Sequence, residues 1–168
     1  MKSSETLSQR VGDALLSRAW RLATAESCTG GGIAAALTDI AGSSQWFERG
    51  FVTYSNQAKQ EMLGVRAETL ASHGAVSEAT VSEMVAGALA HSDAQVAVAV
   101  SGIAGPGGGT LDKPVGTVCL AWQLAGADPV VRTKHFDGDR AAVRAQTAEC
   151  ALRGLLELLD VRDDGAKN

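Results

Sequence analysis

Apolar residues recur three or four positions apart near both ends of the chain, which predicts amphipathic helices there. The first helix is predicted over residues 7–18. The last runs from residue 140 to about residue 160 and follows Asp137 or Asp139, because aspartate is a common helix cap. Its buried face is predicted to consist of Val143, Thr147, Cys150, Ala151, Leu155 and Leu158.

Cap and stop residues predict four more helices between these two. Gly64 ends one of them, because many helices stop at a glycine. Ser77 caps the longest, and Glu78 stands in its first turn, where a carboxylate interacts favourably with the helix dipole. The four helices are predicted over residues 30–37, 55 or 56 to 62, 66–72 and 77–90.

Short apolar and β-branched runs alternate with these helices and predict five strands. Residues 96–100, within the strand predicted over residues 95–100, are continuously apolar, as in a parallel strand buried on both faces. A turn at residues 125–129 makes the last two strands neighbours. The alternation predicts an α/β fold, a three-layer α/β/α sandwich with a mixed, mostly parallel sheet. The strands are predicted over residues 21–25, 51–54, 95–100, 116–122 and 130–136.

Length and composition fit a single domain. We expect one domain over residues 1–168, with its core over about residues 7–160. The formal charge of -4 gives no electrostatic attraction for nucleic acid or for an anionic membrane. Residues 1–13 are polar and contain no apolar signal core, so we expect a cytoplasmic protein.

Cysteine usage argues against a disulfide framework or a zinc site. The three cysteines, Cys28, Cys119 and Cys150, are odd in number and include no CxxC spacing. The three histidines, His73, His91 and His135, do not complete a ligand set either. We therefore expect no metal and no cofactor.

Three polar or glycine-rich turns follow predicted strands. Ligands of open α/β sheets bind beyond the carboxyl ends of strands, so the three turns are expected to meet in one cleft. In the first turn, residues 27–32, Ser27 either exposes its hydroxyl near backbone N–H donors of the next helix or only caps it. Cys28 is an alternative nucleophile without an evident histidine partner. Glu26 either tunes this site or pairs with a base.

The second and third turns supply a candidate base and further donors. Lys59, one helical turn beyond Ser55, is a base for serine if burial lowers its pKa, and otherwise an exposed helix lysine. The third turn, residues 101–115, lacks both the P-loop ending and the GxGxxG order. Its amides can still donate to a ligand, and long irregular loops in compact domains are usually functional.

Arg140 and Arg144 are one helical turn apart at the start of the last helix. Two cations there oppose the helix dipole. A phosphate held by guanidinium groups and helix N–H donors would explain this cost. Pairing with Asp137 or Asp139 is the alternative.

Longer motifs occur in a fixed order along the chain. They are TAESCTGG from residue 24, YSN from residue 54 with Lys59, GAVS from residue 74, SGIAGPGG from residue 101, KPVGTV from residue 113, and GDR with VR from residue 138. With these motifs, over about residues 7–160, the chain resembles the nicotinamide-nucleotide amidases of the CinA C-terminal domain family.

The resemblance implies hydrolysis of nicotinamide mononucleotide to nicotinic acid mononucleotide and ammonia. It implies that Ser27 is the nucleophile, Lys59 its partner and Tyr54 a plausible helper. It also implies a homo-oligomer.

These observations lead to a hypothesis of acyl transfer in which neutral Lys59 takes the proton of Ser27. Backbone N–H groups at residues 29–31, or in the loop of residues 101–105, stabilise the oxyanion. The arginines hold the 5′-phosphate, and Asn56 contacts ribose or amide. The predicted substrate-binding residues are Thr29, Gly30, Gly31, Asn56, Ser101, Gly102, Ala104, Gly105, Arg140 and Arg144. The alternatives are an amidase for another substrate, or a non-catalytic nucleotide-binding module in which Lys59 pairs with phosphate. A lowered Lys59 pKa favours the base.

Overall fold

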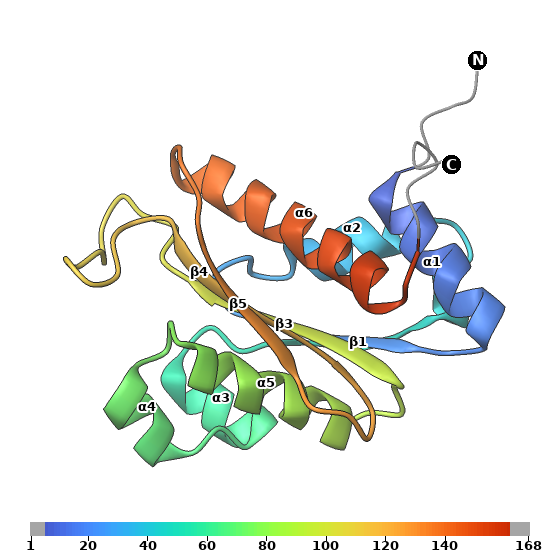
Figure 1. The fold of residues 1–168 in the computed structure, drawn as a ribbon, viewed down its shortest axis with the longest axis horizontal. Coiled ribbons are helices and arrows are strands. Elements are labelled where there is room, and N and C mark those ends of the chain that lie inside the picture. Colours follow the sequence, from blue (N-terminus) through green and yellow to red (C-terminus); the bar gives the residue numbers. More distant parts are fainter. Residues whose placement is uncertain (1–5, 162–168) are drawn as a thin grey trace.

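Five strands form one mixed sheet in the order β2-β1-β3-β4-β5 in the computed structural model, which describes residues 6–161 (Figure 1). β1 pairs in parallel with both β2 and β3, whereas β4 is antiparallel to β3 and to β5. All strands except β4 therefore run in one direction, and the predicted mixed sheet is confirmed. The strands are β1 Leu22–Glu26, β2 Phe47–Val52, β3 Val96–Gly102, β4 Thr117–Leu124 and β5 Val130–His135.

Helices cover both faces of the sheet, which confirms the predicted three-layer sandwich. Helices α1, α2 and α6 lie on one face, and α3, α4 and α5 lie on the other (Figure 1). They are α1 Leu7–Arg18, α2 Gly32–Thr38, α3 Asn56–Leu63, α4 Ala67–His73, α5 Glu78–Ala90 and α6 Arg140–Leu158, with a 3₁₀ turn, η1, at Ser43–Gln45. In the described part of the chain no helix is both long and apolar enough to cross a membrane.

The continuous apolar run of β3 is explained by burial on both faces. Val96, Val98 and Val100 pack into the core beneath α1, α2 and α6. Ala97 and Ala99 point the other way, into the core beneath α5. Because successive side chains of a strand alternate between faces, a strand covered on both sides needs no polar positions.

The cap and stop residues predicted for α3, α5 and α6 are confirmed. Ser55, Ser77 and Asp139 each accept a hydrogen bond from a backbone amide in the first turn of α3, α5 and α6. Gly64 ends α3 in the left-handed conformation, with φ of 72°. Of the two aspartates offered as caps for α6, the structure uses Asp139.

Most predicted boundaries lie within two residues of the observed ones, and three of the differences have a clear physical reason. β2 covers Phe47–Val52 instead of residues 51–54, because Glu48 and Arg49 hide the pattern of a half-exposed edge strand. α2 begins at Gly32 and not at residue 30, because Gly30 and Gly31 have positive φ. The third turn is shorter than predicted, since β3 continues through Gly102.

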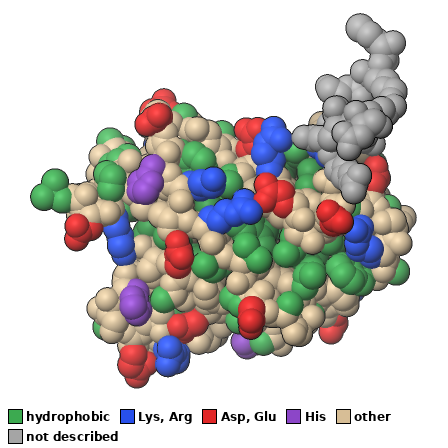
Figure 2. Space-filling view, viewed as in Figure 1, with side chains coloured by type: hydrophobic (Ala, Val, Ile, Leu, Met, Phe, Trp, Pro, Cys, Tyr) green, Lys and Arg blue, Asp and Glu red, His purple; other side chains and the backbone are tan. Residues whose placement is uncertain are grey.

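The predicted buried face of α6 is largely correct. Val143, Thr147, Ala151 and Leu155 are fully buried. Cys150 and Leu158 are only partly buried and pack at the margin of the core. The surface viewed in Figure 2 intersperses Lys and Arg with Asp and Glu and has no large patch of one sign.

Parallel pairing gathers the turns after β1, β2 and β3 at one edge of the sheet. Glu26, the last residue of β1, pairs with Val52 of β2 and Val100 of β3. The polypeptide leaves all three strands at this level. The predicted meeting of the three turns is therefore confirmed by the strand register.

Candidate active site

A cavity of about 270 Å³ lies where these three turns meet. The turn after β1, the start of α3, the segment before α5, the loop after β3 and the start of α6 all contribute to it. Its lining consists of Ser27, Cys28, Tyr54, Asn56, Lys59, Ala75, Val76, Ser101, Gly102, Ile103, Ala104, Gly105, Gly107, Gly108 and Arg140.

Strand periodicity sends Glu26 and Ser27 to opposite faces of the sheet. Leu22, of the same parity as Glu26, packs into the core beneath α1, α2 and α6. Ala23 and Ala25, of the same parity as Ser27, pack into the core beneath α3 and α5. Ser27 therefore reaches the α3 layer, where Lys59 lies, and Glu26 reaches α2.

Lys59 is buried, with 1% of its surface exposed, so the alternative of an exposed helix lysine is wrong. Its Nζ lies 3.0 Å from Ser27 Oγ. The same nitrogen donates to the backbone carbonyl oxygens of Thr53 at 2.9 Å and Tyr54 at 3.2 Å. The local chain provides this geometry, because α3 begins directly after Thr53 and Tyr54 and places Lys59 one turn in.

Burial lowers the pKa of Lys59 below its ordinary value of 10.5, and the nearby Cys28 opposes this only in part. The physical cause is desolvation, which disfavours the ammonium form. The neutral amine is therefore more accessible at Lys59 than at a surface lysine.

Cys28 is adjacent to Ser27 but is not activated. Burial raises the pKa of its thiol to about 11, with a backbone hydrogen bond at Cys28 lowering it less. The thiolate is the reactive form of cysteine, so this environment suppresses its nucleophilicity at neutral pH. The geometry thus favours Ser27 over Cys28.

Arg140 and Tyr54 meet at the mouth of the cavity. Arg140 donates from Nη1 to the carbonyl oxygen of Gly105 at 2.9 Å and from Nη2 to Tyr54 Oη at 3.0 Å. Tyr54 is 59% exposed, so its ring stands at the solvent boundary. Asn56 also lines this side. The structure thus brings Tyr54, Asn56, Ser101, Gly102, Ala104, Gly105 and Arg140 together with Ser27 and Lys59.

Thr29, Gly30, Gly31 and Arg144 do not line this cavity. The amide of Gly30, one of the predicted oxyanion donors, is already engaged, because it donates to the carbonyl oxygen of Ser27. The Thr29 hydroxyl donates to Glu26. Arg144 lines a neighbouring cavity and donates to carbonyl oxygens of the first turn. The Gly30 amide, the Thr29 hydroxyl and the carbonyl groups of Cys28 and Thr29 are therefore engaged in hydrogen bonds within the protein.

Several lining residues carried no catalytic signal in the sequence. Ala75 and Val76 form a wall of the cavity, and Gly107 and Gly108 come from the long loop. They offer backbone and small apolar surface, which residue chemistry does not reveal. Only their place in the GAVS and SGIAGPGG motifs marked them. Lys113 ties the long loop to α4 through the carbonyl oxygen of His73, at 2.7 Å.

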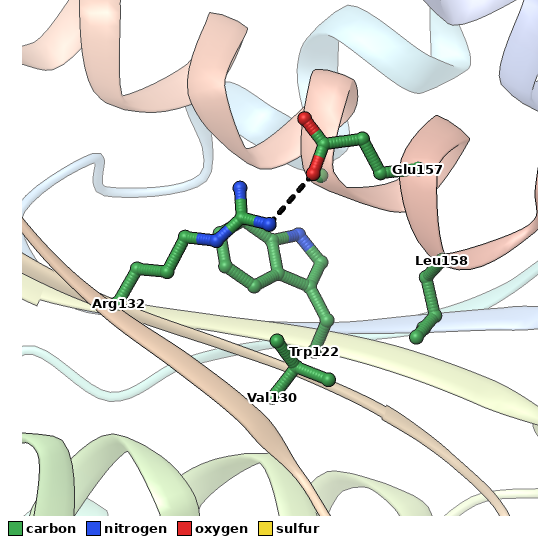
Figure 3. Close-up of a pocket in the computed structure, with 6 residues that line it drawn as sticks. Trp122, Val130, Arg132, Glu157 and Leu158 are labelled. Atoms are coloured by element: carbon green, nitrogen blue, oxygen red, sulfur yellow. Dashed lines mark hydrogen bonds and ion pairs between the residues drawn. The ribbon is translucent and has the colours of Figure 1, made fainter.

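A second cavity, of about 360 Å³, lies between β5 and α6 and contains none of the predicted catalytic residues. Arg132 extends over the Trp122 ring, 5.4 Å from its centroid, and pairs with Glu157 at 2.7 Å (Figure 3). Because cation, ring and carboxylate satisfy one another, this cavity presents no unpaired catalytic group.

Among residues 6–161, no cluster of three or more His, Cys, Asp and Glu side chains could hold a metal ion.

The model of the CinA C-terminal domain matches residues 4–159. The chain belongs to the CinA C-terminal domain family. The nicotinamide-nucleotide amidohydrolase PncC of Escherichia coli (strain K12) is 58% identical over 149 residues, covering 89% of this chain and 90% of that protein. The protein of the same name from Enterobacter agglomerans is 55% identical and covers 92% of this chain and 94% of its own length.

Solved structures of the family have the same fold. The competence damage-inducible protein A (ComA) of Klebsiella pneumoniae subsp. pneumoniae MGH 78578 superposes with a TM-score of 0.89 at 48% identity. The superposition covers 94% of this chain and 97% of that one. The family resemblance inferred from the motifs is therefore confirmed in both sequence and fold.

Proposed function

We propose that this protein hydrolyses the carboxamide of nicotinamide mononucleotide, releasing ammonia and nicotinic acid mononucleotide, with Ser27 as nucleophile and Lys59 as base. The observation that carries the proposal is the contact of the buried Lys59 amine with Ser27 Oγ at 3.0 Å. The amidohydrolase names of relatives at 55–58% identity support the reaction class.

The two backbone carbonyl groups orient the Lys59 amine for this role. A neutral amine has two N–H donors and one lone pair. If the carbonyl oxygens of Thr53 and Tyr54 accept the two N–H bonds, the lone pair faces the Ser27 hydroxyl. An ammonium would instead place all three donors on these same acceptors. In neither state does Lys59 have a donor left for a phosphate, which argues against the nucleotide-clamp alternative.

The reaction then proceeds in two acyl transfers. Lys59 accepts the Ser27 proton as Oγ bonds to the carboxamide carbon, and it returns that proton to the departing nitrogen as the C–N bond breaks. Ammonia leaves an ester on Ser27. Water attacks this ester, giving a proton to Lys59, and the proton returns to Ser27 Oγ as the acid departs.

The oxyanion requires N–H donors that are not already engaged. Of the two sources predicted, the loop after β3 lines the cavity. The amides of Ala104 and Gly105 have no hydrogen-bond partner among residues 6–161, whereas that of Ile103 donates to Thr117. We assign oxyanion stabilisation to this loop. One such donor is commonly worth on the order of 10²-fold in rate.

Activity is expected to rise with pH, because only the neutral form of Lys59 accepts a proton. The acidic limb of kcat/KM for ammonia release should titrate below the ordinary lysine value of 10.5, since burial lowers the Lys59 pKa. Steady-state assays across a broad pH range measure it. A profile that falls with rising pH would instead indicate a charged Lys59.

Arg140→Ala is expected to raise KM for nicotinamide mononucleotide by roughly 10- to 100-fold, the value of a charge-assisted hydrogen bond. Arg140 lies at the mouth of the cavity, where its guanidinium can contact the 5′-phosphate of a bound nucleotide. KM for the phosphate-free riboside should change little. Arg153→Ala, on the exposed part of the same helix, is the matched control. An equal loss with both substrates would contradict the phosphate assignment.

A further inference from the structure

Glu26 is a fully buried carboxylate that does not face the catalytic cavity. It accepts hydrogen bonds from the backbone amides of Ile33 at 2.9 Å and Ala34 at 3.0 Å, and from the Thr29 hydroxyl. It thus occupies the amides at the start of α2 and holds the end of the turn that follows Ser27. A carboxylate at a helix N-terminus is electrostatically stabilised.

Arg144 holds the same turn through its carbonyl groups. Its Nε donates to the carbonyl oxygen of Cys28 at 3.1 Å and its Nη2 to that of Thr29 at 3.2 Å. Cys28 and Thr29 directly follow Ser27, so their peptide planes fix the direction in which the chain leaves the nucleophile. A Cβ atom at Gly30 would stand 3.5 Å from Arg144 Nη2, an ordinary contact, so the positive φ of 59° rather than a lack of space favours glycine here.

Together the two side chains satisfy both kinds of backbone group around the turn. The guanidinium takes its carbonyl groups, and the carboxylate takes the amides and hydroxyl beyond them. Both charges are close to the Cys28 thiol, on whose pKa Glu26 and Arg144 act in opposite directions. Neither residue lines the cavity of Ser27.

We propose that Glu26 and Arg144 are positioning residues that hold the turn after β1, one through its amides and hydroxyl and the other through its carbonyl groups, and thereby fix Ser27 Oγ against Lys59. This inference rests on the proposed role of Ser27 as nucleophile. It assigns Arg144 to the nucleophile turn and leaves substrate phosphate to Arg140. A displacement of about 1 Å at a reacting group can cost on the order of 10²-fold in rate.

Arg144→Gln and Arg144→Lys provide the test, with Glu26→Gln as the variant of the second positioning residue. Lysine keeps the charge but not the fork that reaches two carbonyl groups, so both Arg144 variants should lose kcat. We expect losses of about 10²-fold, with KM for nicotinamide mononucleotide unchanged within about twofold. The preference for the mononucleotide over the riboside should stay at the parent value.

A fluorophosphonate probe, which reacts with activated serines and carries no nucleotide phosphate, measures the reactivity of Ser27 without an amide substrate. Its rate of labelling Ser27, followed by mass spectrometry, should fall in the Arg144 variants about as much as kcat does. Arg153→Gln, nine positions further along α6, is the matched control and should label and turn over like the parent. Arg144 is exposed at the surface, so its variants test the proposal even if Glu26→Gln does not fold.

The outcomes separate this inference from the proposed function. A raised KM and a lost phosphate preference, with normal kcat and normal labelling, would make Arg144 a substrate ligand and overturn the inference. Parent-like kcat and labelling in both Arg144 variants would overturn it too. A parent that releases no ammonia yet labels at Ser27, with slower labelling in the variants, would refute the proposed substrate and support the positioning role.

Discussion

Ser27→Ala is expected to lower kcat for ammonia release from nicotinamide mononucleotide by about 10⁴-fold or more, because removing a nucleophile abolishes the covalent route. Ser27 Oγ is the atom that the Lys59 amine contacts at 3.0 Å, at the end of a strand buried on both faces. Alanine loses only one oxygen from a small side chain. The fold should therefore remain, which thermal unfolding monitored by circular dichroism will measure.

Two companion variants sharpen this experiment. Ser17→Ala removes the same atom from an exposed position on α1 and should retain parental activity. Cys28→Ala addresses the neighbouring thiol, whose raised pKa makes it a poor nucleophile. A trapped acyl adduct on Ser27 in the parent would support the scheme. Near-parental turnover by Ser27→Ala, together with loss of turnover in Cys28→Ala, would reverse the assignment.

Lys59→Met is expected to cause a loss of similar size, about 10⁴-fold in kcat, because methionine fills the buried space without supplying a base. The carbonyl groups of Thr53 and Tyr54 lose their partner. An unsatisfied buried carbonyl costs about 1–3 kcal/mol, and losing a buried amine relieves part of this. We expect a folded, modestly destabilised protein, with stability measured by urea unfolding.

The matched control for this lysine is Lys134→Met on the exposed edge strand β5. It removes the same charge from the molecule without touching the cavity, and it should leave kcat at the parental level. Substrate binding by Lys59→Met should persist, because the proposed phosphate contact belongs to Arg140. Near-normal turnover in a folded Lys59→Met variant would eliminate the Ser27–Lys59 pair as the catalytic unit.

Local sequence determined the secondary structure and the chemical inventory of the site. Cap residues such as Ser55 and Asp139 act on amides only three positions away, so the chain near them suffices to predict their effect. Glycines such as Gly64 end helices for an equally local reason. The motifs around Ser27, Lys59 and the glycine-rich loop identified the family without knowledge of their distances.

Polar residues within β2 break its apolar alternation, so the sequence pattern did not predict where this strand begins. An edge strand that is half exposed carries residues such as Glu48 and Arg49, so its alternation resembles a loop. Its true start at Phe47 follows from parallel pairing with β1, in which Leu22 stands opposite Phe47. Pairing is a long-range property, which no short window of sequence contains.

Only the tertiary structure decided which side chains come into contact and which are shielded from water. Ser27 and Lys59 are 32 positions apart, and their 3.0 Å contact depends on the order of strands in the sheet. The same sequence pattern fits an exposed lysine, and only the surrounding walls bury Lys59 and lower its pKa. Local spacing predicts Arg144 as a phosphate ligand, but it cannot show that carbonyl groups 115 and 116 positions away accept hydrogen bonds from its Nε and Nη2. Chain periodicity encodes elements, whereas desolvation and long-range contact arise when those elements pack.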